Sequence, residues 1–336
     1  MRQNELIGIL YRGILGREPD PEGLAHHCNL LAQGESLEAI AASMHASPEA
    51  DRRRRQKSSP RNINGGNDLI IAQLREKLVI LDVGAQNLEG ESHVYAPLIE
   101  RGVVERIIGF EPLADKAGIR NSTEPLADIR PIALGTGHGE TLHINNYDAT
   151  SSVFPINEDI MHTTYGLDQY KTVRQIPIKT VRLDDVDTPH RIDLMKLDVQ
   201  GYELAILENS IATLEKTLFV QCEVEFHDIY KGQPLFGDVF NFLNSKGFAL
   251  CDIINQVRLS SRKSVDAFAR SCGSTLYWGD AVFMKKSVSR SCDLINQALI
   301  ASCVYGWYDV CYDLLSKYDL ITGEGISERY IRSHGG

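Results

Sequence analysis

The sequence lacks an apolar run long enough to cross a bilayer, and its basic residues are outnumbered by acidic ones. A membrane-spanning helix needs about 20 predominantly apolar residues in succession, so we expect no membrane span. The formal net charge of -10 argues against a nucleic-acid partner, because nucleic-acid-binding proteins usually present a basic face. The first residues, MRQNELIGILYRG, do not have the pattern of a secretory signal peptide.

Paired cysteine motifs are missing as well. The seven cysteines are scattered and include no CxxC pair, which argues against a structural zinc site. An odd number of cysteines without a secretory signal suits free thiols in a reducing compartment better than a disulfide framework. We therefore expect a cytoplasmic protein.

The distribution of apolar residues divides the chain into four parts. Three short helical patterns occupy the N-terminal part, where Asp20-Pro21 has the form of an N-cap followed by proline at the first helical position. The basic segment DRRRRQKSSPRNINGG has no apolar periodicity, which favours a solvated linker over a membrane- or phosphate-binding patch. The boundaries that we predict are 1–50 for a small all-α domain, 51–66 for the linker, 67–287 for the main domain and 288–336 for a C-terminal helical extension.

From residue 77 the pattern changes to short apolar strands that alternate with amphipathic helices. Repeated strand–helix units predict an α/β fold with a doubly wound sheet and a ligand at the carboxyl ends of the strands. The predicted strands comprise residues 77–84, 106–112, 129–135, 191–199, 217–226, 248–254 and 280–286. We expect a hairpin at 136–145 and helices at 92–102, 201–216, 235–247 and 291–318.

The turn after the first predicted strand lacks the glycine spacing of a dinucleotide site. Gly84 is followed by AQNLE, so the second and third glycines of the GxGxxG pattern are absent. Glu89 would also place negative charge where a phosphate has to lie. An NAD-dependent oxidoreductase is therefore disfavoured.

Two carboxylates end the first two predicted strands. Asp82 ends the first strand, where it can pair with an ammonium group, and Glu111 ends the second, where a carboxylate can bind both hydroxyls of a ribose. Taken singly, Asp82 can be a helix cap and Glu111 a surface charge. Together they favour a ligand that has an amino-acid portion and a ribose but no phosphate, and S-adenosylmethionine (SAM) is such a ligand.

An ordered series of motifs between residues 78 and 286 resembles the FkbM family of SAM-dependent methyltransferases. The segments that carry the resemblance are ILDVGAQ, GFEP, PIALGTGHGETLHIN, VRLDDV, IDLMKLDVQGYELAILENS, EVEFHDIY and DAVF. It implies a Rossmann-like class I methyltransferase fold with an antiparallel last strand, and methylation of hydroxyl groups on glycan sugars or metabolites. The cofactor-binding residues that we predict are Asp82, Gly84, Ala85, Gln86, Glu111, Pro112, Ala133, Leu134 and Asp198.

The chain departs from the usual family motifs at a few positions. Gln86 and Leu88 stand where Asn and Gly are usual, and Gln200 replaces the Glu of the DVEG motif. These departures motivate a second hypothesis, in which the protein is an inactive methyltransferase-fold scaffold in glycan assembly. Residues 4–50 are similar to a small helical domain of unassigned function in bacterial proteins, which implies a bacterial origin.

Transfer of a methyl group to a sugar hydroxyl requires alignment of the acceptor and removal of its proton. Asp198 ends the fourth predicted strand, and Glu223, Glu225 and His227 share one side of the fifth at a spacing of two. Asp198, His227 and Glu225 are the catalytic candidates, with His227 or Asp198 as a direct base. Alternatively, Asp198, Glu223 and Glu225 bind Mg²⁺, which would lower the pKa of the hydroxyl. Salt-bridge or capping roles are the structural alternative.

Two further features concern the substrate and the assembly. The loop Asp148–Gln169 is long for a connection, which is typical of lids and substrate contacts but also of surface loops. We expect a hydroxyl-bearing substrate, a sugar or glycoconjugate. Tyr305, Tyr308 and Tyr312 follow one another at helical spacing, which indicates either core packing or a contact between subunits of a homo-oligomer.

Overall fold

The computed structural model describes residues 6–8, 11, 19, 21–33, 35, 40, 41, 44, 63–86, 92–164, 171–259 and 275–334. Two compact units are distinguished: residues 1–65 with 333–336, and residues 66–332. Among the described residues, no helix has the length and apolar character needed to cross a membrane.

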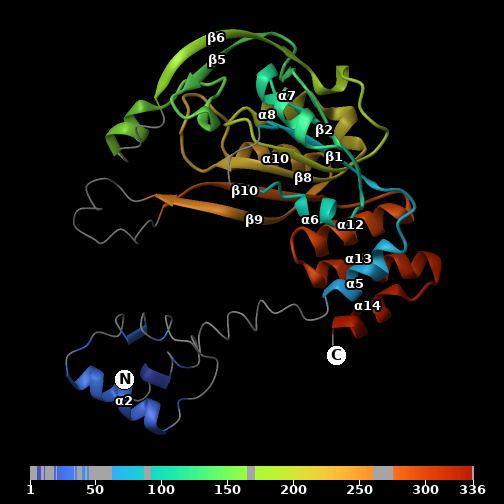
Figure 1. Ribbon diagram of the computed structural model, residues 1–336. Helices are drawn as coiled ribbons and strands as arrows, with labels where there is room; N and C mark the ends of the chain where they lie inside the picture. The colour runs from blue at the N-terminus through green and yellow to red at the C-terminus, as the bar shows by residue number, and fades with distance from the viewer. Residues whose placement is uncertain are drawn as a thin grey trace. The chain divides into compact units, whose positions relative to one another are not determined.

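The larger unit is built on a seven-stranded sheet with the order β3-β2-β1-β7-β8-β10-β9 (Figure 1). Its strands are β1 (Leu78–Val83), β2 (Val104–Phe110), β3 (Ala127–Arg130), β7 (Ile192–Leu197), β8 (Thr217–Glu225), β9 (Phe248–Leu259) and β10 (Thr275–Lys285). β10 is antiparallel to both of its neighbours, whereas the pairs from β3 to β8 are parallel. The structure thus confirms the α/β Rossmann-like fold with an antiparallel last strand.

Both faces of this sheet are covered by helices, and all six residues of β1 are buried. Side chains of a strand alternate between the faces. Ile80, Leu194 and Phe219 are register partners that pack toward helices α6 (Ala96–Glu100), α12 (Ser291–Cys303) and α13 (Tyr308–Thr322). The alternate residues pack toward α8 (Glu203–Glu208), α9 (Ile211–Glu215) and α10 (Phe236–Ser245). The two cores fix the strand ends relative to each other.

Two helices, α8 and α9, stand where one helix is expected at residues 201–216. The interruption has a local cause, since the side chain of Asn209 donates to the carbonyl of Ala205 and the hydroxyl of Ser210 to that of Ile206. Polar side chains that bond to the preceding turn compete with helix propagation in this way. The helix expected at 92–102 is shorter and is limited to α6.

The C-terminal part of the chain is integrated into the larger unit. Every residue of α12 from Asp293 to Ser302 is buried, as in a helix enclosed on all sides. Helix α12 packs between the sheet and the helices α5 (Ile63–Ile71), α13 and α14 (Ile326–His334), which lie together in Figure 1. The Ser302 hydroxyl bonds to Asn67 at 2.7 Å and to Tyr330 at 3.2 Å, which joins α12 to two of these helices.

The prediction of a single third strand at residues 129–135 is wrong. Pro131 has no N–H group, and the N–H of Ile132 donates to the carbonyl of Arg130, so the chain turns sharply. β3 ends at Arg130, and the next strand, β4 (Ala133–Leu134), belongs to a small separate sheet. Ala133 and Leu134 therefore do not end a strand of the main sheet.

The hairpin expected at residues 136–145 is wrong as well. β5 (Gly139–Asn145) pairs antiparallel with β6 (Thr172–Val181), which is distant in the sequence. β4 is parallel to β6, so the small sheet has the order β4-β6-β5. Most side chains of β6 are exposed or half-buried, which explains why its sequence shows little apolar pattern.

The N-terminal unit contains helix α2 (Pro21–Ala32), which begins at Pro21 as expected, whereas Asp20 lies outside the described residues. Buried Ile7, Tyr11, Ile40 and Met44 form its small core, against which residues of α2 pack. Most of the first and third expected helices lie outside the described residues, as do residues 51–62 of the predicted linker. Residues 63–66 already belong to α5.

Candidate functional site

A row of polar side chains continues the apolar core at the carboxyl ends of the strands. Asp82, Lys196 and Gln221 are register partners on β1, β7 and β8. They follow Ile80, Leu194 and Phe219 by two residues and thus share their face of the sheet. Gln221 extends the row, since it donates to Asp280 of β10 at 3.0 Å and accepts from the Tyr305 hydroxyl at 2.9 Å.

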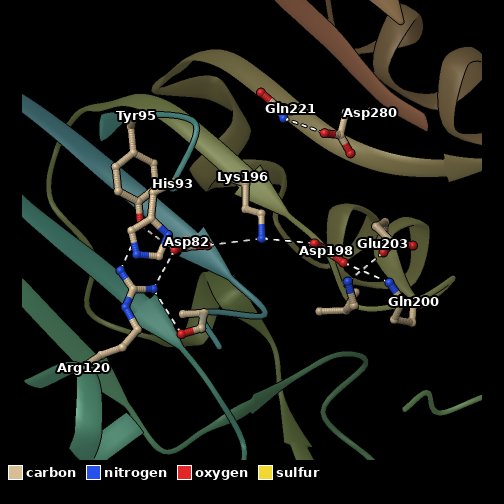
Figure 2. A network of polar contacts seen from close by, with 12 residues as sticks. Asp82, His93, Tyr95, Arg120, Lys196, Asp198, Gln200, Glu203, Gln221 and Asp280 are labelled. Atoms are coloured by element: carbon tan, nitrogen blue, oxygen red, sulfur yellow. Dashed lines mark hydrogen bonds and ion pairs between the residues drawn. The ribbon is translucent and has the colours of Figure 1, made fainter. Parts of the chain in front are cut away.

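Asp82 belongs to a buried network that the sequence did not reveal (Figure 2). Its Oδ2 accepts hydrogen bonds from the Tyr95 hydroxyl at 2.6 Å and from Nη1 of Arg120 at 2.8 Å. Arg120 comes from helix α7 (Ala114–Thr123), and its Nε and Nη2 donate to the Glu124 carboxylate at 3.0 Å and 2.8 Å. The side chains of Arg120 and Asp82 are 0% and 2% exposed. The only trace of this network in the sequence is the spacing of four between Arg120 and Glu124.

Electrostatics keep Asp82 ionised despite its burial. Burial alone would raise the pKa of its carboxyl, but the charges of Lys196 and Arg120 and the bonds from Tyr95 and Arg120 hold that pKa below its ordinary value. The second oxygen, Oδ1, has no hydrogen-bond partner among the described residues, although Nζ of Lys196 lies 3.8 Å away. Lys196 also lies 3.3 Å from Oδ2 of Asp198. It therefore links two carboxylates at the ends of neighbouring strands.

A cavity of about 670 Å³ opens at these strand ends, large enough for a nucleoside ligand. Glu111 lies in its wall, 5% exposed, and its carboxylate accepts a hydrogen bond from the N–H of Leu113 at 2.9 Å. Burial raises the pKa of Glu111, and that hydrogen bond opposes the rise. The predicted cofactor residues that line the cavity are Gly84, Gln86, Glu111, Pro112, Ala133, Leu134 and Asp198.

Two predicted cofactor residues do not line this cavity. Asp82 lies behind the cavity wall, whereas Tyr95 and Lys196, which interact with Asp82, line the cavity. The side chain of Ala85 is buried against Ala117 and Ile129, its N–H bonds to Phe110 and its carbonyl to Arg120. The side chain, the N–H and the carbonyl of Ala85 thus all contact other parts of the protein. A direct role of Ala85 in cofactor binding stays a prediction.

The backbone around residue 84 requires a glycine for a structural reason that is independent of any ligand. The φ of Gly84, +76°, lies in the left-handed region that favours glycine. A Cβ atom at this position would lie 1.9 Å from the carbonyl oxygen of Asp198. The turn after β1 thus approaches the end of β7 closely, and the N–H of Asp198 donates to the carbonyl of Val83 at 3.0 Å.

Gln200 connects the carboxylate of Asp198, which follows β7, with that of Glu223, which lies near the end of β8. Its Nε2 donates to Asp198 at 3.0 Å and to Glu223 at 2.5 Å, and its Oε1 accepts from the Tyr230 hydroxyl at 2.8 Å. Its φ of +59° is unusual for a residue other than glycine, and its carbonyl accepts a hydrogen bond from Ser152. A strained backbone held by several partners is typical of functional sites.

The turn that carries Gln200 is fixed by Glu203 at the start of α8. The Glu203 carboxylate accepts a hydrogen bond from the N–H of Val199 at 2.8 Å and is almost fully buried. Burial raises its pKa to about 7, with the charge of Asp198 contributing, while hydrogen bonds from the backbone oppose the rise. Glu203 therefore stabilises the turn between β7 and α8, and it lines neither of the two cavities.

A second cavity, of about 280 Å³, adjoins the first. Asp198, Gln200 and Ala149 line both cavities, so they mark the junction between them. Glu223 and Glu225 lie in the wall of the second cavity only, and burial raises the pKa of each well above its ordinary value. Three aromatic side chains, those of Tyr147, Tyr230 and Trp278, also line the second cavity.

His227, the loop Asp148–Gln169 and the predicted metal ligands are the remaining parts of the predicted site. His227 lines neither cavity, and its ring stacks on Tyr277 at a centroid distance of 4.4 Å. The start of the loop Asp148–Gln169 borders both cavities, whereas residues 165–169 of this loop lie outside the described residues. No group of three or more metal-ligating side chains placed to hold an ion is found in the part of the chain that the structure describes. The Gln200 amide donates hydrogen bonds to Asp198 and Glu223, two of the three residues predicted to bind Mg²⁺. The magnesium site stays a prediction.

Comparison with known families agrees with this geometry. A family model described as Methyltransferase FkbM domain matches residues 82–250, which include the strand ends that carry Asp82, Glu111 and Asp198. A second model, described as Domain of unknown function (DUF4214), matches residues 1–53. The second match falls on the small N-terminal unit.

A relative with a named activity is the 2-O-methyltransferase NoeI of Sinorhizobium fredii (strain NBRC 101917 / NGR234). The chain is 29% identical to it over 177 residues, which cover 50% of this chain and 71% of NoeI.

Solved structures that the chain resembles include a magnesium protoporphyrin IX methyltransferase from Synechocystis PCC 6803, with a TM-score of 0.30 and 10% identity, covering 85% of this chain and 98% of that one. Another is an S-adenosylmethionine-dependent methyltransferase from Mesorhizobium loti, with a TM-score of 0.34 and 9% identity, covering 66% and 100%. These superpositions are loose, and the fold assignment follows instead from the strand order and directions given above.

Proposed function

Because the chain belongs to the FkbM family of SAM-dependent methyltransferases, we propose that it methylates a hydroxyl group of a carbohydrate or glycoconjugate. The observation that carries the proposal is the position of Asp198, which lines both a cavity of nucleoside size and the smaller cavity beside it. A methyl donor in the first cavity and an acceptor in the second would meet there. The similarity to a relative named 2-O-methyltransferase supports oxygen as the acceptor atom.

The larger cavity has the features that SAM requires. Glu111 directly follows β2 and has its carboxylate in the cavity wall, the position in related sheets that binds the two ribose hydroxyls. Ala133 and Leu134 supply apolar wall for an adenine ring. Asp82 lies behind the wall of this cavity and holds Lys196 and Tyr95, which line it, through an ion pair at 3.8 Å and a hydrogen bond at 2.6 Å. When bound, SAM supplies a methyl group that its positively charged sulfur has already activated.

The protein's own part in the reaction is to orient the acceptor and to take its proton. Asp198 accepts bonds from Lys196 and Gln200, which fix its carboxylate at the junction. Glu225 lines the second cavity only, and burial raises the pKa of its carboxyl well above its ordinary value, which favours uptake of a proton there. We assign orientation of the hydroxyl to Asp198 and removal of the proton to Glu225, with no role for His227.

Two measurements test the proposal. Isothermal titration should detect binding of SAM and of S-adenosylhomocysteine to the folded protein. Transfer of tritiated methyl groups from SAM to a panel of mono- and oligosaccharides should then label at least one acceptor, and NMR of the product should locate the methyl group on oxygen. Binding without transfer to any carbohydrate would overturn the acceptor class, and absence of binding would overturn the cofactor site.

A further inference from the structure

The larger cavity extends beyond the residues that we assign to the cofactor. On the side of β7 away from β1 and β2, its wall is supplied by β8, β9, β10 and the residue that caps the end of α12. These wall residues, which we call the polar end of the cavity, are Gln221, Ile254, Asn255, Asp280 and Val304. Gln221 is the register partner of Lys196, and Figure 2 shows it bonded to Asp280.

Hydrogen bonds fix the polar side chains of this end. The Tyr305 hydroxyl donates to Oε1 of Gln221 at 2.9 Å, so the amide nitrogen of Gln221 faces Asp280, to whose Oδ2 it donates at 3.0 Å. Nδ2 of Asn255 donates to the same oxygen at 2.7 Å. Within the described part of the chain, no hydrogen bond ends on Oδ1 of Asp280 or Oδ1 of Asn255. These two oxygens can therefore accept hydrogen bonds from a molecule in the cavity.

Asn255 reaches Asp280 because strand β9 has a bulge at this point. The register of β9 and β10 shifts here, so that Asn255 and Gln256 together oppose the single residue Gly279. Asn255 has a φ of +49°, which is uncommon for a residue other than glycine. Bulges next to functional sites commonly redirect a side chain. This one turns the side chain of Asn255 toward Asp280 and the cavity.

The polar end matches a ligand that is rich in hydroxyl groups. Its amides and its carboxyl group present donors as well as acceptors, and a hydroxyl group can pair with either kind. Burial raises the pKa of Asp280, and hydrogen bonds from Asn255 and Gln221 oppose the rise. The match does not depend on the charge of Asp280, because a protonated carboxyl group also accepts a hydrogen bond from a hydroxyl. Ile254 and Val304 add apolar wall for the C–H surface of a sugar ring.

A SAM molecule placed as proposed above ends short of Asn255. With the ribose at Glu111 and the sulfur facing Asp198, the methionine portion continues for about five bonds, or about 6 Å when extended. Neighbouring strands lie about 4.8 Å apart, so three strand spacings put Asn255 on β9 about 14 Å from the end of β7. The polar end also adjoins the smaller cavity, because Asp280 is the register partner of Glu223 in its wall.

From this arrangement we infer that the polar end is a second saccharide subsite, which binds the sugar residue next to the one that is methylated. The inference rests on the proposed function and narrows its substrate to an oligosaccharide or the glycan of a glycoconjugate. The methylated residue lies in the smaller cavity, and hydroxyl groups of the neighbouring residue donate to Asp280 and Asn255. The match to the family model ends at residue 250 and includes neither of these two residues.

A chain-length series with the full-length protein and SAM tests the subsite. Glucose, galactose, mannose and N-acetylglucosamine are each offered as mono-, di- and trisaccharide, and transfer of tritiated methyl groups gives kcat/KM. In a series that is methylated, we expect the disaccharide to exceed the monosaccharide at least about tenfold, as one or two added hydrogen bonds provide. Equal values for mono- and disaccharides would overturn the inference but leave the function standing, whereas no transfer to any carbohydrate would overturn both.

The variant Asn255→Gly tests the residue assignment. Glycine keeps the left-handed backbone of the bulge and removes the amide, so the gain from monosaccharide to disaccharide should fall by at least about threefold. The matched control is Gln256→Ala, at the exposed neighbouring position outside the cavity lining, which should keep the wild-type gain. An unchanged gain in Asn255→Gly would remove Asn255 from the subsite.

Titration of the same variant with S-adenosylhomocysteine separates the subsite from the cofactor site. We expect the affinity of Asn255→Gly to stay within about twofold of the wild type. A loss of at least about tenfold would show that the polar end binds the methionine portion of the cofactor, and it would overturn the inference. The wild-type chain-length series decides the case even if the variant does not fold.

Discussion

Nη1 of Arg120 lies 2.8 Å from Oδ2 of Asp82, and both side chains are buried behind the wall of the larger cavity. Asp82 comes from β1 and Arg120 from α7, so the ion pair joins the first strand to the helix that follows the second. Tyr95 bonds to both partners and stacks on His93, which lines the cavity. The pair thus supports the wall of the cavity in which we propose that SAM binds.

Replacement of Arg120 by Met should destabilise the protein strongly. The variant removes the cation that is hydrogen-bonded to the buried carboxylate of Asp82, and breaking a buried ion pair in this way costs about 3–5 kcal/mol at neutral pH. The folded-state pKa of Asp82 is lowered in the wild type, so its contribution is present above the unfolded pKa and is lost as the pH falls through the folded value. In the variant the carboxyl takes up a proton more readily, and the deficit should shrink between pH 8 and pH 5.

Urea unfolding of both proteins at the two pH values measures this effect. The control is Arg332→Met, which removes an exposed ion pair with Glu328 and should change stability little. A pH-independent deficit would show that lost packing, and not the unpaired carboxylate, causes the destabilisation.

Replacement of Gly84 by Ala should be far more damaging than the same change at Gly102. Both residues have positive φ, +76° and +67°, so both replacements carry a similar backbone strain of about 1 kcal/mol. At Gly84 the new Cβ would also lie 1.9 Å from the Asp198 carbonyl, whereas at Gly102 no atom lies within 4 Å. We expect Gly84→Ala to lower Tm by many degrees more than Gly102→Ala and to impair SAM binding. Equal shifts in Tm would mean that the approach to Asp198 is not tight.

Sequence patterns located the central strands of the main sheet, but neither the end of β3 nor the small sheet. β1, β7 and β8 are buried on both faces and read as continuous apolar runs, which is why their ends, with Asp82 and Asp198, were located. β6 is largely exposed and pairs with a strand far away in the sequence, so neither its pattern nor its partner was visible. Pro131, which has no N–H group to donate to a neighbouring strand, marks the break after β3 in the sequence.

The site was predicted in part for similar reasons. Glu111 and Asp198 were found because strand ends of a parallel sheet meet at one edge. Arg120 and Tyr95 come from helical and loop segments whose ordinary composition gives no hint of burial next to Asp82. In the sequence, Gln200 stands out only as a departure from a family motif. Its hydrogen bonds to Asp198 and Glu223 depend on a positive φ that the sequence pattern does not predict.

Glu111→Ala should weaken SAM binding at least about tenfold, because charged hydrogen bonds to the ribose are worth about 1.5–3 kcal/mol. The control is Glu105→Ala, which removes an exposed carboxylate from the same strand and should leave the affinity unchanged. Isothermal titration with S-adenosylhomocysteine measures both. Equal affinities in the two variants would remove Glu111 from the cofactor site.

Gln200→Ala should lower kcat/KM for the acceptor at least about tenfold while the affinity for SAM stays within about twofold. The variant loses the amide that bridges Asp198 and Glu223, so the two carboxylates repel each other and one retains a proton to higher pH. The acidic limb of the pH–rate profile should therefore move toward higher pH. Gln175→Ala, at an exposed position of β6, is the control. A uniform loss of rate without a shift of the profile would indicate a purely structural role.

A crystal structure of the protein with S-adenosylhomocysteine tests the central claim most directly, because it locates the sulfur that carries the methyl group in SAM. We expect the ribose hydroxyls at Glu111 and the sulfur facing Asp198, toward the smaller cavity. A sulfur that points away from Asp198, or a ribose bound elsewhere than at Glu111, would contradict the arrangement of donor and acceptor proposed for this methyltransferase.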